Sequence, residues 1–192
     1  MTETLQVRRG TEADKATVIS LIDEAAAWLD SLGIDQWARP WPTRAKRDER
    51  VVNGLRSGDT WMVQDSGLVI GTITYRSSGN EDLWTSVDRA EPAVYISRLM
   101  VTRSYAGLGI GSSLIDWAGK RAARAWDAQW IRVDVWTTNE ALHNYYEKRG
   151  FDHVRICGYD RETYPSSALF QKPITEIDGA AEARFTSAYG VS

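Results

Sequence analysis

Three glycines at alternate positions constrain this chain more than any other feature of its sequence. They are Gly107, Gly109 and Gly111, and they separate an apolar, strand-like segment (93–101) from a helix-like one that runs from about Gly109 to Trp126. Glycine lets the backbone approach a ligand closely, and a helix N-terminus presents unpaired N–H groups with partial positive charge. The pattern therefore predicts a strand–turn–helix unit that binds an anion such as a phosphate.

Two common phosphate-binding loops do not fit this run. The P-loop requires a lysine directly after its last glycine, and no lysine follows these glycines. The dinucleotide fingerprint requires a further glycine where this chain has Ser112 or, in the other register, Leu114. A turn without a ligand would need only one glycine, because each glycine adds a cost in backbone entropy. The spacing favours a ligand-binding turn of another type.

The segment from Ala106 to Gly111 resembles the acyl-CoA diphosphate loop of the GNAT superfamily of N-acetyltransferases. The family pattern is Gln/Arg-x-x-Gly-x-Gly/Ala, and this chain departs from it at Ala106. The family side chain at that position assists the diphosphate, and Arg103 is a nearby candidate to compensate. Further along, Asn139 followed by the run 146–151 (Tyr-Glu-Lys-Arg-Gly-Phe) is similar to the family's second signature. The resemblance covers residues 5 to 172.

The resemblance implies a single α/β (mixed α+β) domain with a GNAT-like fold. Its central, mixed and twisted sheet is flanked by helices, and the strands at 93–101 and 130–136 splay apart to bind acyl-CoA. We assign residues 1–174 to this domain and 175–192 to a C-terminal extension that could either fray or be pinned by Phe185 and Tyr189. The periodicity of the chain predicts helices at about 11–31, from 43 or 47 to 55, and at 139–149, and loops at 33–46 and 77–92. It also predicts a hairpin of strands at 60–65 and 68–76 and further strands at 5–9, 151–157 and 168–172.

The resemblance also places the cofactor. It implies that the pantetheine arm of acetyl-CoA pairs with the backbone of Leu99, Met100 and Val101, with the oxyanion against an N–H near Met100. The diphosphate would bind the turn, whose residues are Gly107, Leu108, Gly109, Ile110, Gly111 and Ser112. Asn139 is assigned to the cofactor arm by resemblance, and its position equally favours a helix N-cap. The two roles do not exclude each other.

Tyr146 is the catalytic candidate, and its role comes from the resemblance. It would donate a proton to the departing thiolate, a transfer that is uphill for a phenol of ordinary pKa, so a local shift would assist. The alternative is a tyrosine packed in the core. The base is less defined, because the central strand carries Ser97 and Arg98 where the family often has a glutamate. Asp134 is a candidate, since apolar neighbours would raise its pKa, but it could equally face away from the site.

The composition limits the function. With 192 residues, 43% hydrophobic and 26% charged, the chain suits one globular domain, and a net charge of −3 does not favour nucleic-acid binding. The single cysteine (Cys157) excludes an internal disulfide and is consistent with the cytoplasm. We find no membrane span, signal peptide or metal motif in the sequence. The expected partners are acetyl-CoA and a small-molecule amine. The sequence does not determine the oligomeric state, and a homodimer is one of the possibilities.

Three functions remain in competition. The leading one is acetyl transfer from acetyl-CoA to a primary amine of a small molecule by direct attack in a ternary complex. The others are acetylation of a protein or peptide amine, and a non-catalytic acyl-CoA sensor. Tryptophans in predicted loops could wall a pocket for a cationic amine together with nearby carboxylates, or simply pack as a lid. The residues concerned are Trp37, Trp41, Trp84, Asp35, Glu81 and Asp82.

Overall fold

The computed structural model describes residues 4–38, 40, 42–157, 166–177 and 179–187. They form one sheet of eight strands in the order β6-β7-β5-β4-β3-β2-β1-β8. The strands are β1 (Leu5–Arg9), β2 (Thr60–Asp65), β3 (Leu68–Arg76), β4 (Ala93–Val101), β5 (Trp130–Val135), β6 (Asp152–Ile156), β7 (Ala168–Pro173) and β8 (Phe185–Ser187). The helices are α1 (Lys15–Ser31), α2 (Arg44–Arg56), α3 (Ser86–Ala90), α4 (Ile110–Trp126) and α5 (Glu140–Glu147).

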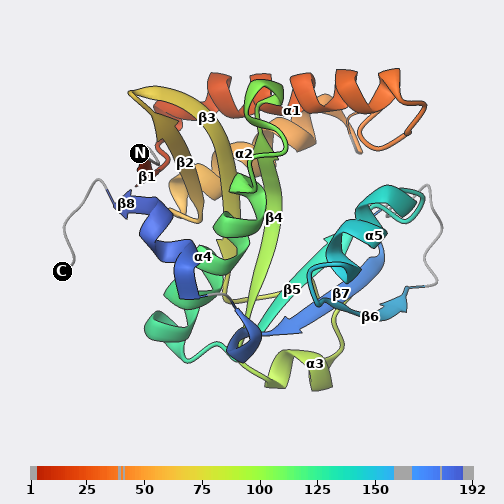
Figure 1. Cartoon of the computed structure of the whole chain (residues 1–192). Helices are drawn as coiled ribbons and strands as arrows, with labels where there is room; N and C mark the ends of the chain where they lie inside the picture. Colours follow the sequence, from red (N-terminus) through yellow and green to blue (C-terminus); the bar gives the residue numbers. More distant parts are fainter. Residues whose placement is uncertain (1–3, 39, 41, 158–165, 178, 188–192) are drawn as a thin grey trace.

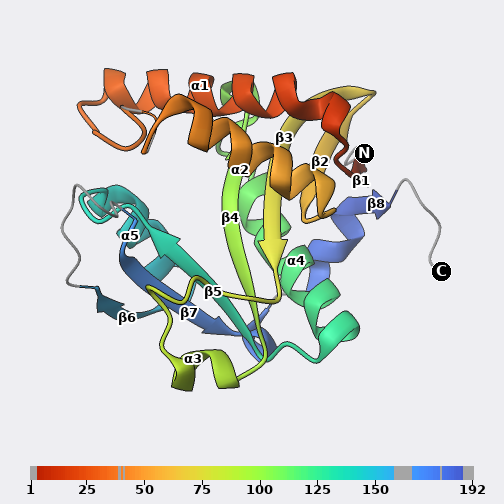
Figure 2. The same cartoon turned by 180° about the vertical axis from the view of Figure 1, so that it is seen from behind.

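Helices cover both faces of the sheet. Helices α1 and α2 lie on one face, and α4 lies on the other (Figures 1 and 2). Side chains of β4 alternate between the two layers: Met100 packs with residues of α1 and α2, whereas Leu99 packs against the cluster that contains the α4 residues Leu114 and Trp117. No helix among the described residues combines the length and apolar character needed to cross a bilayer.

Strands β4 and β5 diverge in the middle of the sheet, as expected for the fold. They pair in parallel only from Ala93 opposite Trp130 to Ile96 opposite Val133. Beyond this point β4 stays with β3 as far as Val101, while β5 stays with β7. The two strands therefore separate like the arms of a V, which both views of the molecule show (Figures 1 and 2). The expectation of a mixed sheet with splayed central strands is confirmed.

Most predicted elements agree with the observed ones to within a few residues. The hairpin between β2 and β3 turns at Ser66 and Gly67, whose φ angles of 48° and 85° fit a turn with two left-handed residues. Helix α3 was missed, because the segment 77–92 looked like a loop. It is only five residues long, too short for a period, and it depends on the N-cap Thr85, whose side chain accepts from the N–H of Asp88.

The described part of the C-terminal segment packs against the domain, with Phe185 in the role of an anchor that the sequence left open. A 3-10 turn at Gly179–Arg184 leads into β8, which pairs in parallel with β1. Phe185 is buried with 8% of its surface exposed, and Glu182 accepts two hydrogen bonds of 2.6 Å from Arg124 on α4. The pairing at the sheet edge and the buried ring fix residues 179–187 to the domain. Residues 188–192 of the predicted extension lie outside the described residues.

Candidate functional site

The glycine turn links the end of β4 to α4 in an open conformation. Gly107 and Gly109 have φ angles of 80° and 72°, a region that strains other residues. Helix α4 begins at Ile110, and no side chain caps it at the N-cap position, Gly109. A Cβ atom at Gly107 would meet nothing within 4 Å. The first-turn amides of α4, which have no partner within the helix, are thus suited to an anion.

A cation from the far end of the chain lies beside this turn. Arg184 donates to the carbonyl of Leu108 at 2.6 Å and to the hydroxyl of Ser113 at 3.3 Å. Arg103, which we expected to compensate for Ala106, lies elsewhere: its guanidinium stacks over the ring of Trp28 at 3.8 Å. No pattern in the sequence indicates Arg184, because its place at the turn depends on the pairing of β8 with β1 and on the contact of Glu182 with α4.

The gap between β4 and β5 leaves backbone groups of β4 without a strand partner on that side. Met100 pairs with Thr72 of β3, and the N–H of Thr102 donates to Ile70 at 2.8 Å. Backbone groups two residues apart point to the same side, so the amide of Met100 faces β3. The amide of Val101, which lies between Met100 and Thr102, is therefore the one that faces the gap. The position of the oxyanion near Met100 stays a prediction.

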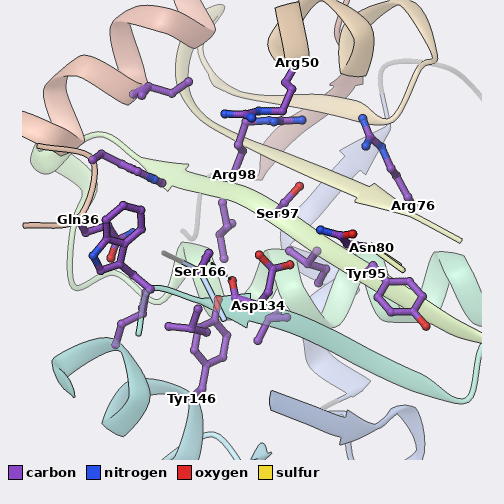
Figure 3. A pocket seen from close by; sticks show the side chains of 18 of the residues that line it. Gln36, Arg50, Arg76, Asn80, Tyr95, Ser97, Arg98, Asp134, Tyr146 and Ser166 are labelled. Carbon is purple, nitrogen blue, oxygen red and sulfur yellow. Dashed lines mark hydrogen bonds between the residues drawn. The ribbon is translucent and has the colours of Figure 1, made fainter. Parts of the chain in front are cut away.

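A cavity of about 500 Å³ fills the gap and extends to both layers of helices. Its walls combine the ends of β4 and β5, helix α5, the start of α4 and the α1–α2 layer (Figure 3). The polar and aromatic lining residues are Gln36, Trp37, Arg47, Arg50, Arg76, Ser78, Asn80, Tyr95, Ser97, Arg98, Asp134, Trp136, Tyr145, Tyr146 and Ser166. One space thus connects Gly111, at the glycine turn, with side chains able to exchange protons.

Tyr146 of α5 packs in the core and also reaches this cavity. Its ring stacks on Phe170 and meets Phe151 edge to face, with centroid distances of 6.1 and 5.1 Å. No hydrogen-bond partner of its hydroxyl is found within the described ranges. Burial, followed by the nearby Tyr145 and Asp134, raises the pKa of Tyr146 above its ordinary value. The phenol therefore stays protonated, although this shift makes it a weaker acid rather than a stronger one.

Asp134 of β5 turns its carboxylate into the cavity and toward the space that Tyr146 also faces (Figure 3). Burial raises the pKa of Asp134 to about 6, although a hydrogen bond with Ser166 and the charge of Arg98 oppose the rise. Of the two orientations left open by the sequence, the structure has the one that faces the site. A carboxylate with a pKa just below neutrality is suited to act as a general base.

Asn139 is the N-cap of α5. Its side-chain oxygen accepts from the N–H of Leu142 at 3.0 Å, and its amide donates to the Gln36 side chain at 2.6 Å. The residue is buried, with 5% of its surface exposed. The capping role is therefore present, and the bond to Gln36 ties α5 to the loop after α1. Contact of Asn139 with a cofactor arm stays a prediction.

Of the described tryptophans and carboxylates considered for a cationic pocket, only Trp37 lines the cavity. Trp84 is buried in a separate cluster with Leu83 and Leu169. Asp35 accepts hydrogen bonds from Trp136 and Thr138, and Glu81 pairs with Arg89 at 2.9 Å. Neither of these carboxylates nor Asp82 lines the cavity, and Trp41 lies outside the described residues.

Comparisons with known proteins agree with this geometry. Residues 22–151 match the model of the Acetyltransferase (GNAT) family. The uncharacterised N-acetyltransferase YesJ of Bacillus subtilis is 26% identical over 165 residues, which span 84% of this chain and 86% of that protein.

Solved structures agree as well. A GNAT-family acetyltransferase from Listeria monocytogenes has 21% identity and a TM-score of 0.67, covering 88% of this chain and 94% of its own. The PaiA N-acetyltransferase of Thermoplasma acidophilum, solved in complex with coenzyme A, has 19% identity and a TM-score of 0.64, covering 88% of this chain and 99% of its own.

Proposed function

Because the chain belongs to the GNAT acetyltransferase family and is therefore an acyltransferase, we propose that it moves an acetyl group from acetyl-CoA to a small-molecule primary amine. The cavity is the observation that carries this proposal. Its lining runs from Gly111 at the start of α4, through the strand gap, to Asp134 and on to Arg50 of α2. A donor entering from the α4 side and an amine entering from the α2 side would meet in one space. Such a meeting allows direct attack in a ternary complex.

The donor would bind along the turn and the gap. Its diphosphate would accept hydrogen bonds from the amides of residues 107–112, and the guanidinium of Arg184, already held against Leu108, would add a positive charge. The pantetheine arm would pair with backbone groups of Leu99 to Val101, among which the amide of Val101 faces the gap. This arrangement supports acetyl-CoA as the co-substrate, and it needs no side chain at Ala106.

The reaction would use two side chains on opposite sides of the thioester. The amine nitrogen attacks the thioester carbonyl while Asp134 accepts the amine proton, and a backbone N–H of β4 near Met100 stabilises the oxyanion. The carbon–sulfur bond then breaks, and the Tyr146 hydroxyl donates a hydrogen bond and a proton to the departing thiolate. The products are the acetylated amine and free CoA. Burial raises the pKa of the phenol, but the same enclosure raises the pKa of the thiol that forms.

The test is release of free thiol from acetyl-CoA in the presence of a panel of amines, including amino acids, polyamines, aminoglycosides and short peptides. We expect thiol release that depends on both protein and amine, with a product heavier by one acetyl group. Transfer only to peptides would instead identify a protein-modifying enzyme. Binding of acetyl-CoA without thiol release for any amine would contradict the proposal and favour a sensor.

A further inference from the structure

The part of the cavity next to α2, where the acceptor amine would enter, carries more positive than negative charge among its described residues. Over the ranges that the structure describes, four arginines line it, Arg47, Arg50, Arg76 and Arg98, against one carboxylate, that of Asp134. Two of these arginines also pair with carboxylates that do not line the cavity. Arg47 pairs with Asp23 and Asp48 at 2.6 and 2.9 Å, and Arg76 pairs with Asp59 at 2.8 Å. No carboxylate of the described chain forms an ion pair of this kind with Arg98.

A β-bulge directs Arg98 to its place. The pairing of β4 with β3 shifts by one residue between Ser97 and Met100, and Arg98 has a φ angle of 45°, which is unusual for a residue with a side chain. Figure 3 shows the side chain extending from β4 toward Arg50 of α2. Bulges of this kind often re-aim a side chain near a functional site. The local strain therefore serves to bring a guanidinium under α2.

Helix α2 leaves space for this guanidinium. Gly54 lies one turn after Arg50, and a Cβ atom there would be 3.3 Å from a terminal nitrogen of Arg98 and 3.7 Å from one of Arg76. It would also be 2.8 Å from the hydroxyl of Thr60. A glycine inside a helix costs about 1 kcal/mol relative to alanine. The crowding around Arg98 and Thr60 accounts for its presence.

The Arg98 guanidinium has no hydrogen-bond or ion-pair partner in the part of the chain that the structure describes. Burial, with the nearby Arg76 and Arg50, lowers its pKa to about 10, so it stays charged at neutral pH. Enclosing a charge without a partner is costly, and enclosing it beside like charges is more so. An anion from outside the protein would relieve both costs. The planar guanidinium matches the geometry of a carboxylate or a phosphate.

We propose, on the basis of the acetyl transfer proposed above, that the acceptor is an amine bearing an anionic group, held by Arg98 together with Arg50 and Arg76. Asp134 lies on the opposite strand of the gap, so an amine attached to this anion by a short chain faces the carboxylate (Figure 3). The two ends of the acceptor thus find opposite charges on opposite walls. Amino acids and phosphorylated small amines have this chemistry, and polyamines do not.

The experiment compares matched acceptors by thiol release from acetyl-CoA. Each amino acid is paired with its decarboxylated amine, and an amine phosphate is paired with the corresponding amino alcohol. We expect kcat/KM to favour the anionic member by about 100-fold, the size of a charge-assisted contact. The two sets of pairs distinguish a carboxylate from a phosphate. In Arg98→Gln this preference should fall to near unity, mainly through KM, while the KM for acetyl-CoA keeps its wild-type value.

Arg44→Gln is the matched control, because Arg44 is an exposed arginine of the same helix α2 and does not line the cavity. It should keep the full preference, and Arg98→Lys should keep part of it. If Arg98→Gln does not fold, the preference for the anionic acceptor is measured in Arg50→Gln instead. The comparison of matched acceptors with the wild-type protein still tests the proposal. Equal or better transfer to the neutral members would overturn the acceptor class while leaving acetyl transfer intact.

A calorimetric titration separates the two proposals if no amine is acetylated. Amino acids and amine phosphates are titrated into protein saturated with CoA. Heat that appears with the wild type and disappears in Arg98→Gln would support the anion site even though the proposed transfer had failed. Absence of binding by every anionic amine would overturn the anion site.

Discussion

At the scale of single residues, the candidate chemistry depends on two groups that burial shifts in the same direction. Tyr146 and Asp134 both face the strand gap, and enclosure raises the pKa of each. The consequences differ. The tyrosine is kept protonated and can only donate, whereas the aspartate titrates near neutrality and can accept. The same buried environment thus makes Tyr146 a proton donor and Asp134 a proton acceptor.

Tyr146→Phe tests the donor. The ring contacts with Phe151 and Phe170 remain, so the free energy of unfolding should change little, while the rate of thiol release should fall by about 100-fold because the thiolate leaves without a proton. The Kd for acetyl-CoA should stay within a small factor of the wild-type value. Tyr75→Phe is the control: it removes a buried hydroxyl that accepts from Arg121 outside the cavity. Unchanged turnover in Tyr146→Phe would remove this residue from the mechanism.

Asp134→Asn tests the acceptor through a pH profile. In the wild type, kcat/KM should rise as Asp134 ionises around its pKa of about 6 and then level off. The asparagine cannot accept the proton, so activity should fall by about 100-fold or more and this inflection should disappear. An inflection near pH 6 that persists in the variant would assign the titration to another group.

The same substitution should stabilise the fold near neutral pH. The folded pKa of Asp134 is raised, so its contribution to stability is full below the ordinary pKa and is lost as the pH rises through about 6. Above that pH the wild type encloses a charge that the variant lacks. Urea unfolding at pH 8 should show Asp134→Asn more stable by about 2 kcal/mol, with little difference at pH 4. If the variant were less stable than the wild type at pH 8, other contacts of the Asp134 carboxylate would have to outweigh the cost of burying its charge.

At the scale of elements, the turn and the strands around it could be predicted from the sequence, but their side-chain partners could not. The glycine spacing located the start of α4, and alternation located the β2–β3 hairpin. Helix α3 was missed because five residues carry no period. The bulge at Arg98 was missed because a shift in pairing depends on the neighbouring strand. Arg184 was missed because its place at the turn depends on a strand pairing across almost the whole chain.

Gly107→Ala tests the turn. Its φ angle of 80° should cost an alanine about 1–2 kcal/mol of strain, and relaxation of the backbone should move the amides away from the diphosphate. We expect the Kd for acetyl-CoA to rise by about tenfold, measured by calorimetry. Gly67→Ala is a close control, since Gly67 has a φ angle of 85° and also has no atom within 4 Å of an added Cβ. It should lose similar stability and keep the wild-type Kd.

At the scale of the whole molecule, the two ends of the chain close one edge of the sheet. Strand β8 pairs with β1, and the 3-10 turn before it crosses to α4 through Glu182 and Arg124. This path places Arg184 at the glycine turn. A segment that composition marked as an extension therefore contributes to the edge of the sheet and supplies a charge beside the proposed diphosphate site.

Arg184→Gln tests this connection. The variant removes the charge but keeps a side chain able to donate to Leu108, so the melting temperature should change little. The Kd for acetyl-CoA should rise by about tenfold, and this loss should shrink at high salt because the contact is electrostatic. Arg124→Gln breaks the neighbouring pair with Glu182 and serves as the control. An equal loss of affinity in both variants would indicate a structural effect of the segment rather than a contact.

Hydrogen exchange of the backbone amides, with and without acetyl-CoA, tests the central arrangement most directly. The account predicts slower exchange in two separate stretches, residues 99–101 on β4 and residues 107–112 at the turn, with smaller changes on β1 and β2. Protection confined to other parts of the chain, or no protection at saturating acetyl-CoA, would contradict the binding of the coenzyme between the diverging strands.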